Sequence, residues 1–306
     1  MLKAPILVRP LVIGASGLVG GAFHDALLAL GADVRGTYHT RARHGLLPFS
    51  LDSDPAPFLD VHRPTLLVMA SAVTHVDWCE MHEAEAMEQN VGRLRPVVEW
   101  CARHDVPLIF FSTDYVFDGS SGPYAEDAER NPINVYGRSK RLGEDLVMGL
   151  ARRAILRVTN VFDIGRDEKN FLHRCVLTLR DRRDLIVPAD QIATPTYAPW
   201  LAGQVLDLIE RGALAGPESP PLLHVGCDEA VSRVEFAANV AMLLGADARL
   251  VKGKPTSELG QAAARPLRGG LRNTMLKHLL GVVRLSLDDA LRDCLPRMRT
   301  LYAGQP

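Results

Sequence analysis

The sequence predicts an α/β protein in which a doubly wound parallel sheet carries a smaller C-terminal lobe. In its first half, short aliphatic runs alternate with longer amphipathic stretches, and a glycine-rich turn follows the first run. Strands that alternate with helices form parallel sheets through right-handed crossovers, with helices on both faces. The 306 residues suffice for about two domains. We place the sheet domain at residues 1–160 and the lobe at residues 161–306, with some later segments returning to the first domain.

The first 160 residues supply the expected strands and helices of the sheet domain. The strands are expected at Leu11–Ile13, Asp33–Tyr38, Thr65–Ala70, Pro107–Ser112 and Ala154–Asn160. The helices, with apolar residues near a spacing of 3.6, are expected at Leu18–Leu30, His82–Arg103 and Val135–Arg152. This order is typical of the Rossmann fold.

After residue 160 the expected elements become shorter. Ser232 and Glu235 form a capping-box pattern that starts a helix ending at Gly245. Residues Lys252–Gly270 are expected to form a loop, followed by two short helices. The other expected elements are a helix at Asn170–Arg182 and strands at Leu185–Val187 and Leu222–Cys227. This half has too few aliphatic runs to form the strands of a large sheet. We therefore expect it to pack as a smaller lobe on the first half.

The composition argues against several classes of protein. Lysine and arginine number 35 against 36 acidic residues, and this near balance disfavours nucleic-acid binding and polybasic membrane binding. No uninterrupted apolar run approaches the roughly 18 residues of a membrane span. The cysteines show no metal-ligand spacing and predict neither a metal site nor a disulfide framework. We therefore expect a cytoplasmic protein with no metal, nucleic-acid or membrane partner.

Residues 14–20, GASGLVG, form a GxxGxxG turn directly after the first strand and at the start of a helix. Glycines permit the tight turn and the close approach of a pyrophosphate, which the free N–H groups of the helix then bind. This context predicts a dinucleotide site rather than a glycine turn without a ligand. The expected contacts are Gly14, Ser16, Gly17, Leu18 and Gly20.

The end of the second strand indicates which dinucleotide binds. A carboxylate at this place binds the adenosine 2′-hydroxyl of NAD, whereas residues 35–43, RGTYHTRAR, contain none. Arg41 and Arg43 can pair with a 2′-phosphate, and His39 stands beside them. The alternative is a pair of solvated loop arginines. We expect NADP(H) in preference to NAD(H).

Tyr136 and Lys140 place a phenol and an ammonium four residues apart, on one face of the expected helix. A positive charge near the phenol is expected to lower the pKa of Tyr136 and to make it a proton donor near neutral pH. By itself, this spacing is most often a surface pair. It gains significance because Ser112 and Thr113 end the preceding strand, where a doubly wound sheet holds reactive groups.

Two longer motifs carry a resemblance to a known family. Residues 112–119 read STDYVFDG, and residues 131–140 read NPINVYGRSK, with Gly143 and Glu144 after them. In these segments the sequence resembles the extended short-chain dehydrogenases/reductases, and more narrowly the dTDP-4-dehydrorhamnose reductase family. Further segments agree in the same order along the chain: Val76-Asp77, Asn90, Leu156-Arg157, Asn170-Phe171, Asp190-Gln191, Pro195-Thr196 and Arg265-Pro266.

The resemblance implies an NADPH-dependent reduction of the C4 keto group of a nucleotide-linked 4-keto-6-deoxy sugar. Thr113, Tyr136 and Lys140 match the family's catalytic triad. Tyr136 would protonate the carbonyl oxygen, Thr113 would hydrogen-bond it, and Lys140 would hold the nicotinamide ribose. The loop after the third strand would supply further cofactor contacts at Ala70, Ser71 and Ala72. The implied contacts with the nucleotide sugar are Ser112, Asp114, Tyr115, Asn170, Gln191 and Thr196. A homodimer is left open.

The sequence also departs from the family pattern. The family's Asn-Ala-Ala after the third strand is Met69-Ala70-Ser71 here, and Asp190–Thr196 lacks a glycine. Some members bind magnesium through an acidic residue just after the glycine turn, where this chain has Gly21–Phe23, so we expect no metal. Two other functions stay open. One is an NADP-binding regulatory subunit resembling the beta subunit of methionine adenosyltransferase. The other is a sugar-nucleotide epimerase or dehydratase, although Tyr115 stands where a dehydratase has its second carboxylate.

Overall fold

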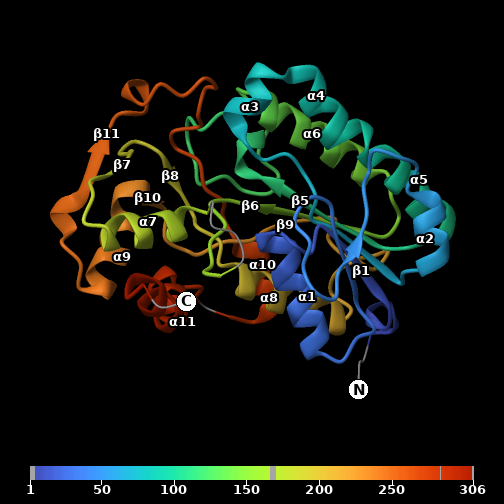
Figure 1. Cartoon of the computed structure of the whole chain (residues 1–306). Helices are drawn as coiled ribbons and strands as arrows, with labels where there is room; N and C mark the ends of the chain where they lie inside the picture. Colours follow the sequence, from blue (N-terminus) through green and yellow to red (C-terminus); the bar gives the residue numbers. More distant parts are fainter. Residues whose placement is uncertain (1–3, 166–169, 283, 305–306) are drawn as a thin grey trace.

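The computed structural model describes residues 4–165, 170–282 and 284–304. Its centre is a seven-stranded sheet in the order β3-β2-β1-β4-β5-β6-β9, with every pairing parallel (Figure 1). The strands are β1 (Pro10–Ile13), β2 (Arg35–Tyr38), β3 (Leu47–Pro48), β4 (Leu66–Met69), β5 (Leu108–Thr113), β6 (Arg153–Val158) and β9 (Leu222–His224). The predicted doubly wound sheet is confirmed. Its order reverses between β1 and β4, and such sheets bind ligands at the carboxyl ends of the strands beside that point.

Alternating side chains divide each central strand between two cores. Leu11 and Ile13 of β1 point to one face of the sheet and Val12 points to the other, as the period of two in a strand requires. The Val12 face is covered by α1 (Leu18–Ala29), α8 (Ala198–Glu210) and α10 (Thr274–Leu280). The opposite face is covered by α2 (Ala56–His62), α5 (Leu94–His104) and α6 (Val135–Met148). Burial on both faces explains why the strands are almost continuously aliphatic.

Three elements of the second half join this sheet. β9 pairs with β6, α8 packs on α1, and α10 packs on β9. The sequence analysis did not predict α8. Its buried residues include Leu201, Ala202, Val205, Leu206 and Ile209, which recur at spacings of three and four, so the helical period was present in the sequence but was not recognised.

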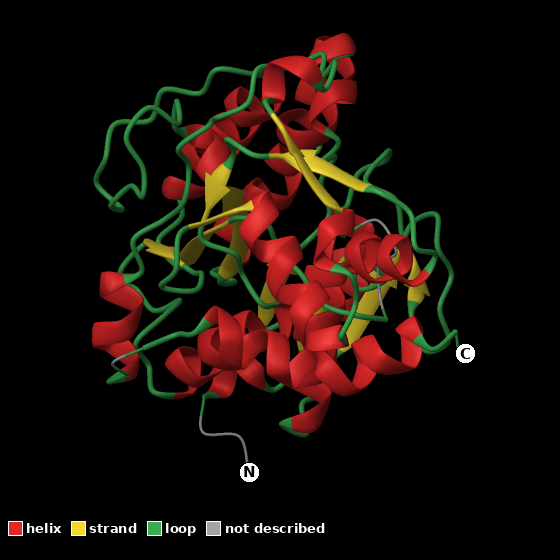
Figure 2. Ribbon diagram, turned by 90° about the vertical axis from the view of Figure 1, so that its left-hand side faces the viewer, coloured by secondary structure: helices red, strands yellow, loops and turns green. Residues whose placement is uncertain are grey.

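The lobe has its own hydrophobic core and lies to the left of the sheet in Figure 1. It contains the helices α7 (Phe171–Arg180), α9 (Arg233–Leu244) and α11 (Leu287–Tyr302). Its paired strands are β7 (Leu185–Pro188) with β11 (Val251–Lys254), and β8 (Ile192–Ala193) with β10 (Val231–Ser232). Figure 2 shows helices gathered around the strands of both parts. Within the described ranges, no helix is both long and apolar enough to cross a membrane.

Two expectations for the second half are wrong. Residues 252–254, the start of the expected loop, belong to the strand β11 instead, because pairing with β7 orders a polar segment that lacks a strand pattern. The last helix, α11, has 16 residues and is not short. The capping box, in contrast, is confirmed: Ser232 Oγ accepts from the Glu235 N–H, and the Glu235 carboxylate accepts from the Ser232 N–H.

The single helix predicted at His82–Arg103 is interrupted. It consists of α4 (Glu83–Met87), a π-helical turn (Glu88–Gly92) and α5, and it follows the short helix α3 (Val76–Met81). In the π turn, Asn90 Oδ1 accepts from the Val73 N–H at 2.8 Å, while Asn90 Nδ2 donates to the Val73 carbonyl and to Ser139 Oγ, each at 3.0 Å. The interruption thus lets the Asn90 side chain connect the loop after β4 to α6. π turns inside helices are frequently found at functional sites.

Candidate active site

The glycine turn between β1 and α1 has the shape that a phosphate group requires. Gly14 has φ +88°, and a Cβ at Gly20 would lie 2.3 Å from the Gly14 carbonyl oxygen, so side chains are excluded at both positions. Gly17 is the N-cap of α1, and no side chain among the described residues caps this helix. The first N–H groups of α1 are therefore available to an anion.

The loop after β4 lies against this turn. A Cβ built on Gly14 would be 3.0 Å from the backbone carbon of Ala70 and from the backbone nitrogen of Ser71. The structure thereby brings together the expected cofactor residues of two segments that are more than fifty positions apart. Ser71 and Ala72 are exposed beside the turn.

A carboxylate that the sequence analysis missed lies near the end of β2. Asp52 Oδ2 is 3.6 Å from His39 Nε2, and the same carboxylate forms an ion pair with Arg93. A hydrogen bond from Ser50 is the main reason that the pKa of Asp52 lies below its ordinary value. Asp52 follows β3, well beyond the residues searched for an acid, and only the pairing of β3 with β2 brings it close.

The two arginines expected at a 2′-phosphate differ in position. Arg41 is exposed in the loop after β2. Arg43 lines a cavity along the flank of α1, together with Ala26 and Ala29 of that helix and Arg297 of α11. This cavity lies beside the later turns of α1 rather than its N-terminus, so the two arginines do not share one environment.

The carboxyl end of β5 holds the expected reacting groups. Thr113, the last residue of β5, and Tyr136, in the first turn of α6, share a side-chain hydrogen bond. A Cβ at Gly137 would lie 2.1 Å from the Tyr115 carbonyl oxygen, so only glycine lets α6 begin this close to the turn after β5. The helix is fixed by Asn134, whose Oδ1 accepts from the Gly137 N–H at 2.8 Å.

Lys140 lies one helical turn after Tyr136, and its side chain is buried with 4% exposure. Its Nζ is 4.1 Å from the centre of the Phe110 ring. Burial lowers the pKa of Lys140 to about 8, against the opposing effect of the Glu144 carboxylate. The ammonium is thus held in a desolvated environment, which destabilises its charged form relative to the neutral amine.

One electrostatic expectation is wrong. Burial raises the pKa of Tyr136 above its ordinary value, although the Thr113 hydrogen bond acts in the opposite direction. The expected lowering by Lys140 is not found, because desolvation of the phenol dominates and Lys140 is itself close to losing its proton. Tyr136 is consequently a protonated phenol at neutral pH.

Among the expected substrate residues, Ser112, Asp114 and Tyr115 lie with this group. The Ser112 hydroxyl is buried without a hydrogen-bond partner in the described part of the chain, which marks a place where a ligand atom can supply the partner. Asp114 is buried and accepts from the Gly270 N–H at 3.1 Å. Burial raises the pKa of Asp114 in spite of that bond. Tyr115 packs edge-to-face on Tyr136, with the ring centres 5.8 Å apart.

The other three expected substrate residues have their polar groups engaged within the lobe or at its junction with the sheet. Thr196 Oγ1 donates to the Val225 carbonyl at 2.8 Å and accepts from the Thr159 N–H at 3.3 Å. Asn170 caps α7. Gln191 Nε2 donates to side-chain oxygens of Thr256 and Gln261. No group of three or more His, Cys, Asp or Glu side chains suited to a metal occurs in the described ranges.

A glycine turn after the first strand of a doubly wound sheet, with a Tyr136/Lys140 pair on the helix that follows β5, defines an extended short-chain dehydrogenase/reductase. This is a class of NAD(P)-dependent oxidoreductases. Within it, the chain belongs to the family described as the RmlD substrate binding domain, whose model matches residues 8–300.

Named relatives agree with this assignment. A "dTDP-4-keto-6-deoxy-D-glucose reductase" of Streptomyces niveus is 33% identical over 271 residues, which are 88% of each chain. The "Methionine adenosyltransferase 2 subunit beta" of Danio rerio is 29% identical over 296 residues, 94% of this chain and 90% of that one. The crystal structure of a dTDP-4-dehydrorhamnose reductase from Bacillus anthracis in complex with NADP is 25% identical, with a TM-score of 0.83, and covers 94% of this chain and 99% of that chain.

Proposed function

We propose that the protein uses NADPH to reduce the C4 keto group of a dTDP-linked 4-keto-6-deoxy sugar. The observation that carries the proposal is the hydrogen-bonded pair Thr113 and Tyr136 beside the buried Lys140. The Streptomyces niveus relative, named a reductase of such a sugar, supports the substrate class. The NADP in the Bacillus anthracis structure supports the cofactor.

We infer that the cofactor lies at the carboxyl edge of β1 and β4, where the glycine turn meets the loop after β4. We infer that its pyrophosphate lies on the glycine turn and the first turn of α1, because N–H groups and excluded side chains meet there. His39 and Arg41 would lie toward the adenosine end, with Ala70, Ser71 and Ala72 along the other wall. When bound, NADPH supplies the hydride for the reduction.

The side chains of this protein supply the proton and hold the carbonyl group. Because burial keeps the pKa of Tyr136 high, its hydroxyl stays protonated and can donate to the carbonyl oxygen as negative charge develops there. The Thr113 hydroxyl, which donates to Asp114 Oδ1 at 3.3 Å in this structure, would turn its one proton to the carbonyl oxygen and so give that oxygen a second hydrogen bond. Lys140, in its charged form, stabilises negative charge on this face of α6.

The nucleotide sugar would lie between the sheet edge and the lobe. Ser112, Asp114 and Tyr115 bound the sheet side, and the unpartnered Ser112 hydroxyl supports a polar ligand there. Asn170, Gln191 and Thr196 would act indirectly, since their hydrogen bonds shape the lobe side of the same junction. A cytoplasmic location belongs to the proposal as well, supported by five cysteines that are all unpaired and buried.

The test is NADPH oxidation with dTDP-4-keto-6-deoxyglucose and related sugar nucleotides. The wild type should consume NADPH in proportion to substrate, whereas an epimerase or dehydratase would recycle its cofactor. Tyr136→Phe removes one hydroxyl and should lower kcat by about 10²–10⁴-fold with NADPH affinity retained. Tyr124→Phe is the matched control, because its phenol donates to Asp118 away from the triad. Near wild-type turnover of Tyr136→Phe would refute the assignment.

A regulatory subunit is the second candidate, and the similarity to the Danio rerio beta subunit over nearly the whole chain favours it. In that case the protein would bind NADPH tightly and would turn over none of the sugar nucleotides. The intact Thr113, Tyr136 and Lys140 support the enzyme over this alternative.

A further inference from the structure

We propose that Glu80 on α3 is a positioning residue for Tyr136, because its carboxylate holds the first N–H group of the helix that carries this tyrosine. The inference rests on the proposed function, in which Tyr136 supplies the proton. The sequence analysis gave Glu80 no role, since nothing in the sequence shows that α3 and the start of α6 meet.

The contact joins two segments that are 55 positions apart. Glu80 Oε2 accepts from the Val135 N–H at 2.9 Å, and Val135 is buried with 1% exposure. The N-cap Asn134 already accepts from the Gly137 N–H with its side chain. The first N–H groups of a helix have no partner inside the helix, so a buried one needs an acceptor from another element. Glu80 supplies that acceptor at the residue directly before Tyr136.

Glu80 lies on a short helix whose own position is fixed. His75 caps the start of α3 through a hydrogen bond of 3.0 Å. Cys79, the residue before Glu80, is fully buried together with Val135 in a small apolar cluster, and Tyr136 packs against this cluster. The Glu80 carboxylate therefore reaches α6 from a packed surface rather than from a loose loop.

The start of α6 is also closely packed. A Cβ at Gly137 would lie only 3.0 Å from Pro132 Cβ, in addition to its clash with the turn after β5. Loss of the Glu80 carboxylate would leave the buried Val135 N–H without its acceptor, and the first turn of α6 would shift to regain one. Tyr136 belongs to that turn, and a displacement of about 1 Å at a reacting group can lower the rate by about 10²-fold.

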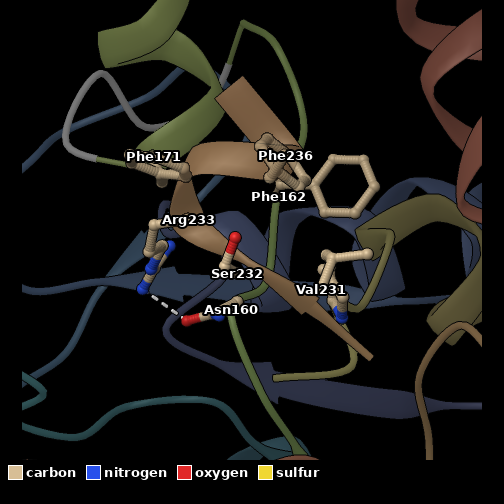
Figure 3. A pocket seen from close by; sticks show the side chains of 8 residues that line it. Asn160, Phe162, Phe171, Val231, Ser232, Arg233 and Phe236 are labelled. Atoms are coloured by element: carbon tan, nitrogen blue, oxygen red, sulfur yellow. Dashed lines mark hydrogen bonds between the residues drawn. The ribbon is translucent and has the colours of Figure 1, made fainter. Parts of the chain in front are cut away.

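The lobe is joined to the sheet at another place, which does not involve Glu80. Asn160 follows β6, and its side chain accepts a hydrogen bond from Arg233 at the start of α9, as Figure 3 shows. The loss of Glu80 should therefore affect the proton donor and not the binding of the nucleotide sugar between the sheet edge and the lobe.

The experiment compares Glu80 variants by steady-state kinetics with NADPH and dTDP-4-keto-6-deoxyglucose. Glu80→Ala removes the acceptor and should lower kcat by about 10–100-fold, with the sugar-nucleotide KM and the NADPH affinity within about twofold of the wild type. Glu80→Gln keeps an oxygen at the same reach and should recover most of kcat. Glu80→Asp keeps the charge but is one methylene shorter, so it should resemble Glu80→Ala.

The matched control is Glu83→Ala. Glu83 also bonds to α6, but through an exposed ion pair with the Arg138 side chain at 2.8 Å, so its loss should leave kcat unchanged. A second measurement needs no substrate. Hydrogen exchange of the Val135 amide, followed by NMR, should be about tenfold faster in Glu80→Ala and unaltered in Glu83→Ala, because only the first variant loses a bond that protects this amide.

An unchanged kcat in Glu80→Ala would overturn the proposal while the activity of the wild type upholds the proposed function. Recovery by Glu80→Asp but not by Glu80→Gln would also overturn it, since charge rather than position would then matter. A wild type that reduces no sugar nucleotide would overturn the proposed function alone. In that case the exchange rates decide whether Glu80 fixes the turn that carries Tyr136, and unaltered exchange in Glu80→Ala would reject this as well.

Discussion

Lys140, to which we assign a role in the proposed reaction, is buried at the expense of stability. Its ammonium is 4% exposed and faces the Phe110 ring, and its pKa is lowered from 10.5 to about 8. The folded state therefore binds this proton more weakly than the unfolded state. Below pH 8 both states are protonated and the full cost applies, whereas between about pH 8 and 10.5 the stability gains as the native lysine becomes neutral.

We expect Lys140→Met to be more stable than the wild type by about 1–3 kcal/mol at pH 7, because an apolar chain replaces a desolvated cation. The same variant should lose most of its reductase activity. Denaturant unfolding at pH 7 and pH 10.5 measures the difference, which should shrink at the higher pH. Equal or lower stability of the variant at pH 7 would contradict the lowered pKa.

Arg41 and Arg43 were equivalent in the sequence and are not equivalent in the structure, since Arg43 lines the cavity on the flank of α1. We expect Arg41→Ala to weaken NADPH binding by about tenfold, or about 1.4 kcal/mol, with little change for NADH. Arg43→Ala serves as the comparison and should have a smaller effect. Titration calorimetry with both cofactors decides this, and identical losses for NADPH and NADH in Arg41→Ala would refute a 2′-phosphate contact.

At the scale of elements, one buried carboxylate joins α6 to the sheet. Glu144 accepts from Arg157 of β6 through both of its oxygens at 2.8 Å, and from Arg130 at 3.1 Å. Arg157 in turn contacts the His224 ring at the end of β9. The helix that carries Tyr136 and Lys140 is therefore anchored by ion pairs to a buried carboxylate, in addition to its apolar contacts.

Glu144→Gln should destabilise the protein by about 3–5 kcal/mol, because it leaves Arg157 buried without its counter-charge. Asp207→Asn is the matched control on α8: it breaks an exposed pair with Arg211 and should cost less than about 1 kcal/mol. Unfolding free energies from urea titrations provide the comparison. A loss of less than 1 kcal/mol for Glu144→Gln would show that the network contributes little.

At the scale of the whole molecule, the segment at 256–272 joins the lobe to the sheet domain. Asp77 on α3 accepts from the Ala263 N–H at 3.0 Å and pairs with Arg265 at 2.8 Å, while Asn134 donates to the Ala264 carbonyl at 2.8 Å. These bonds lie next to the capped start of α6, so the position of the segment is coupled to the position of Tyr136.

We expect Asp77→Asn to increase the rate of tryptic cleavage after Arg268, an exposed residue of this segment, by about tenfold, since losing roughly 1.4 kcal/mol raises the open population by that factor. The substrate KM should rise as well, with NADPH affinity unchanged. Asp105→Asn, which breaks an exposed pair with Arg152, should leave the cleavage rate unaltered. Unchanged cleavage in Asp77→Asn would indicate that the segment is held by its other contacts.

The sequence was informative where the determining interactions are local. The order of strands and helices could be predicted from the periodicity of apolar residues. The glycine turn was recognised because it lies between a strand and a helix, and the Tyr136/Lys140 pair because the two residues are one helical turn apart. Asp52 beside His39, and Arg233 beside Asp114, depend on segments that meet only after folding, so no nearby pattern marked them. The raised pKa of Tyr136 likewise depends on burial, which spacing does not reveal.

The return of α8 and β9 to the sheet has a consequence for how the protein is made. α8 covers α1 and completes the Val12 face, yet it is synthesised only after β6 and α7. A nascent chain that has just finished β6 still presents that apolar face to its surroundings. Residues 1–160 are accordingly not a module that can be expressed or exchanged by itself. An excised nucleotide-binding unit, or a chimera between relatives, has to carry residues 198–224 with it.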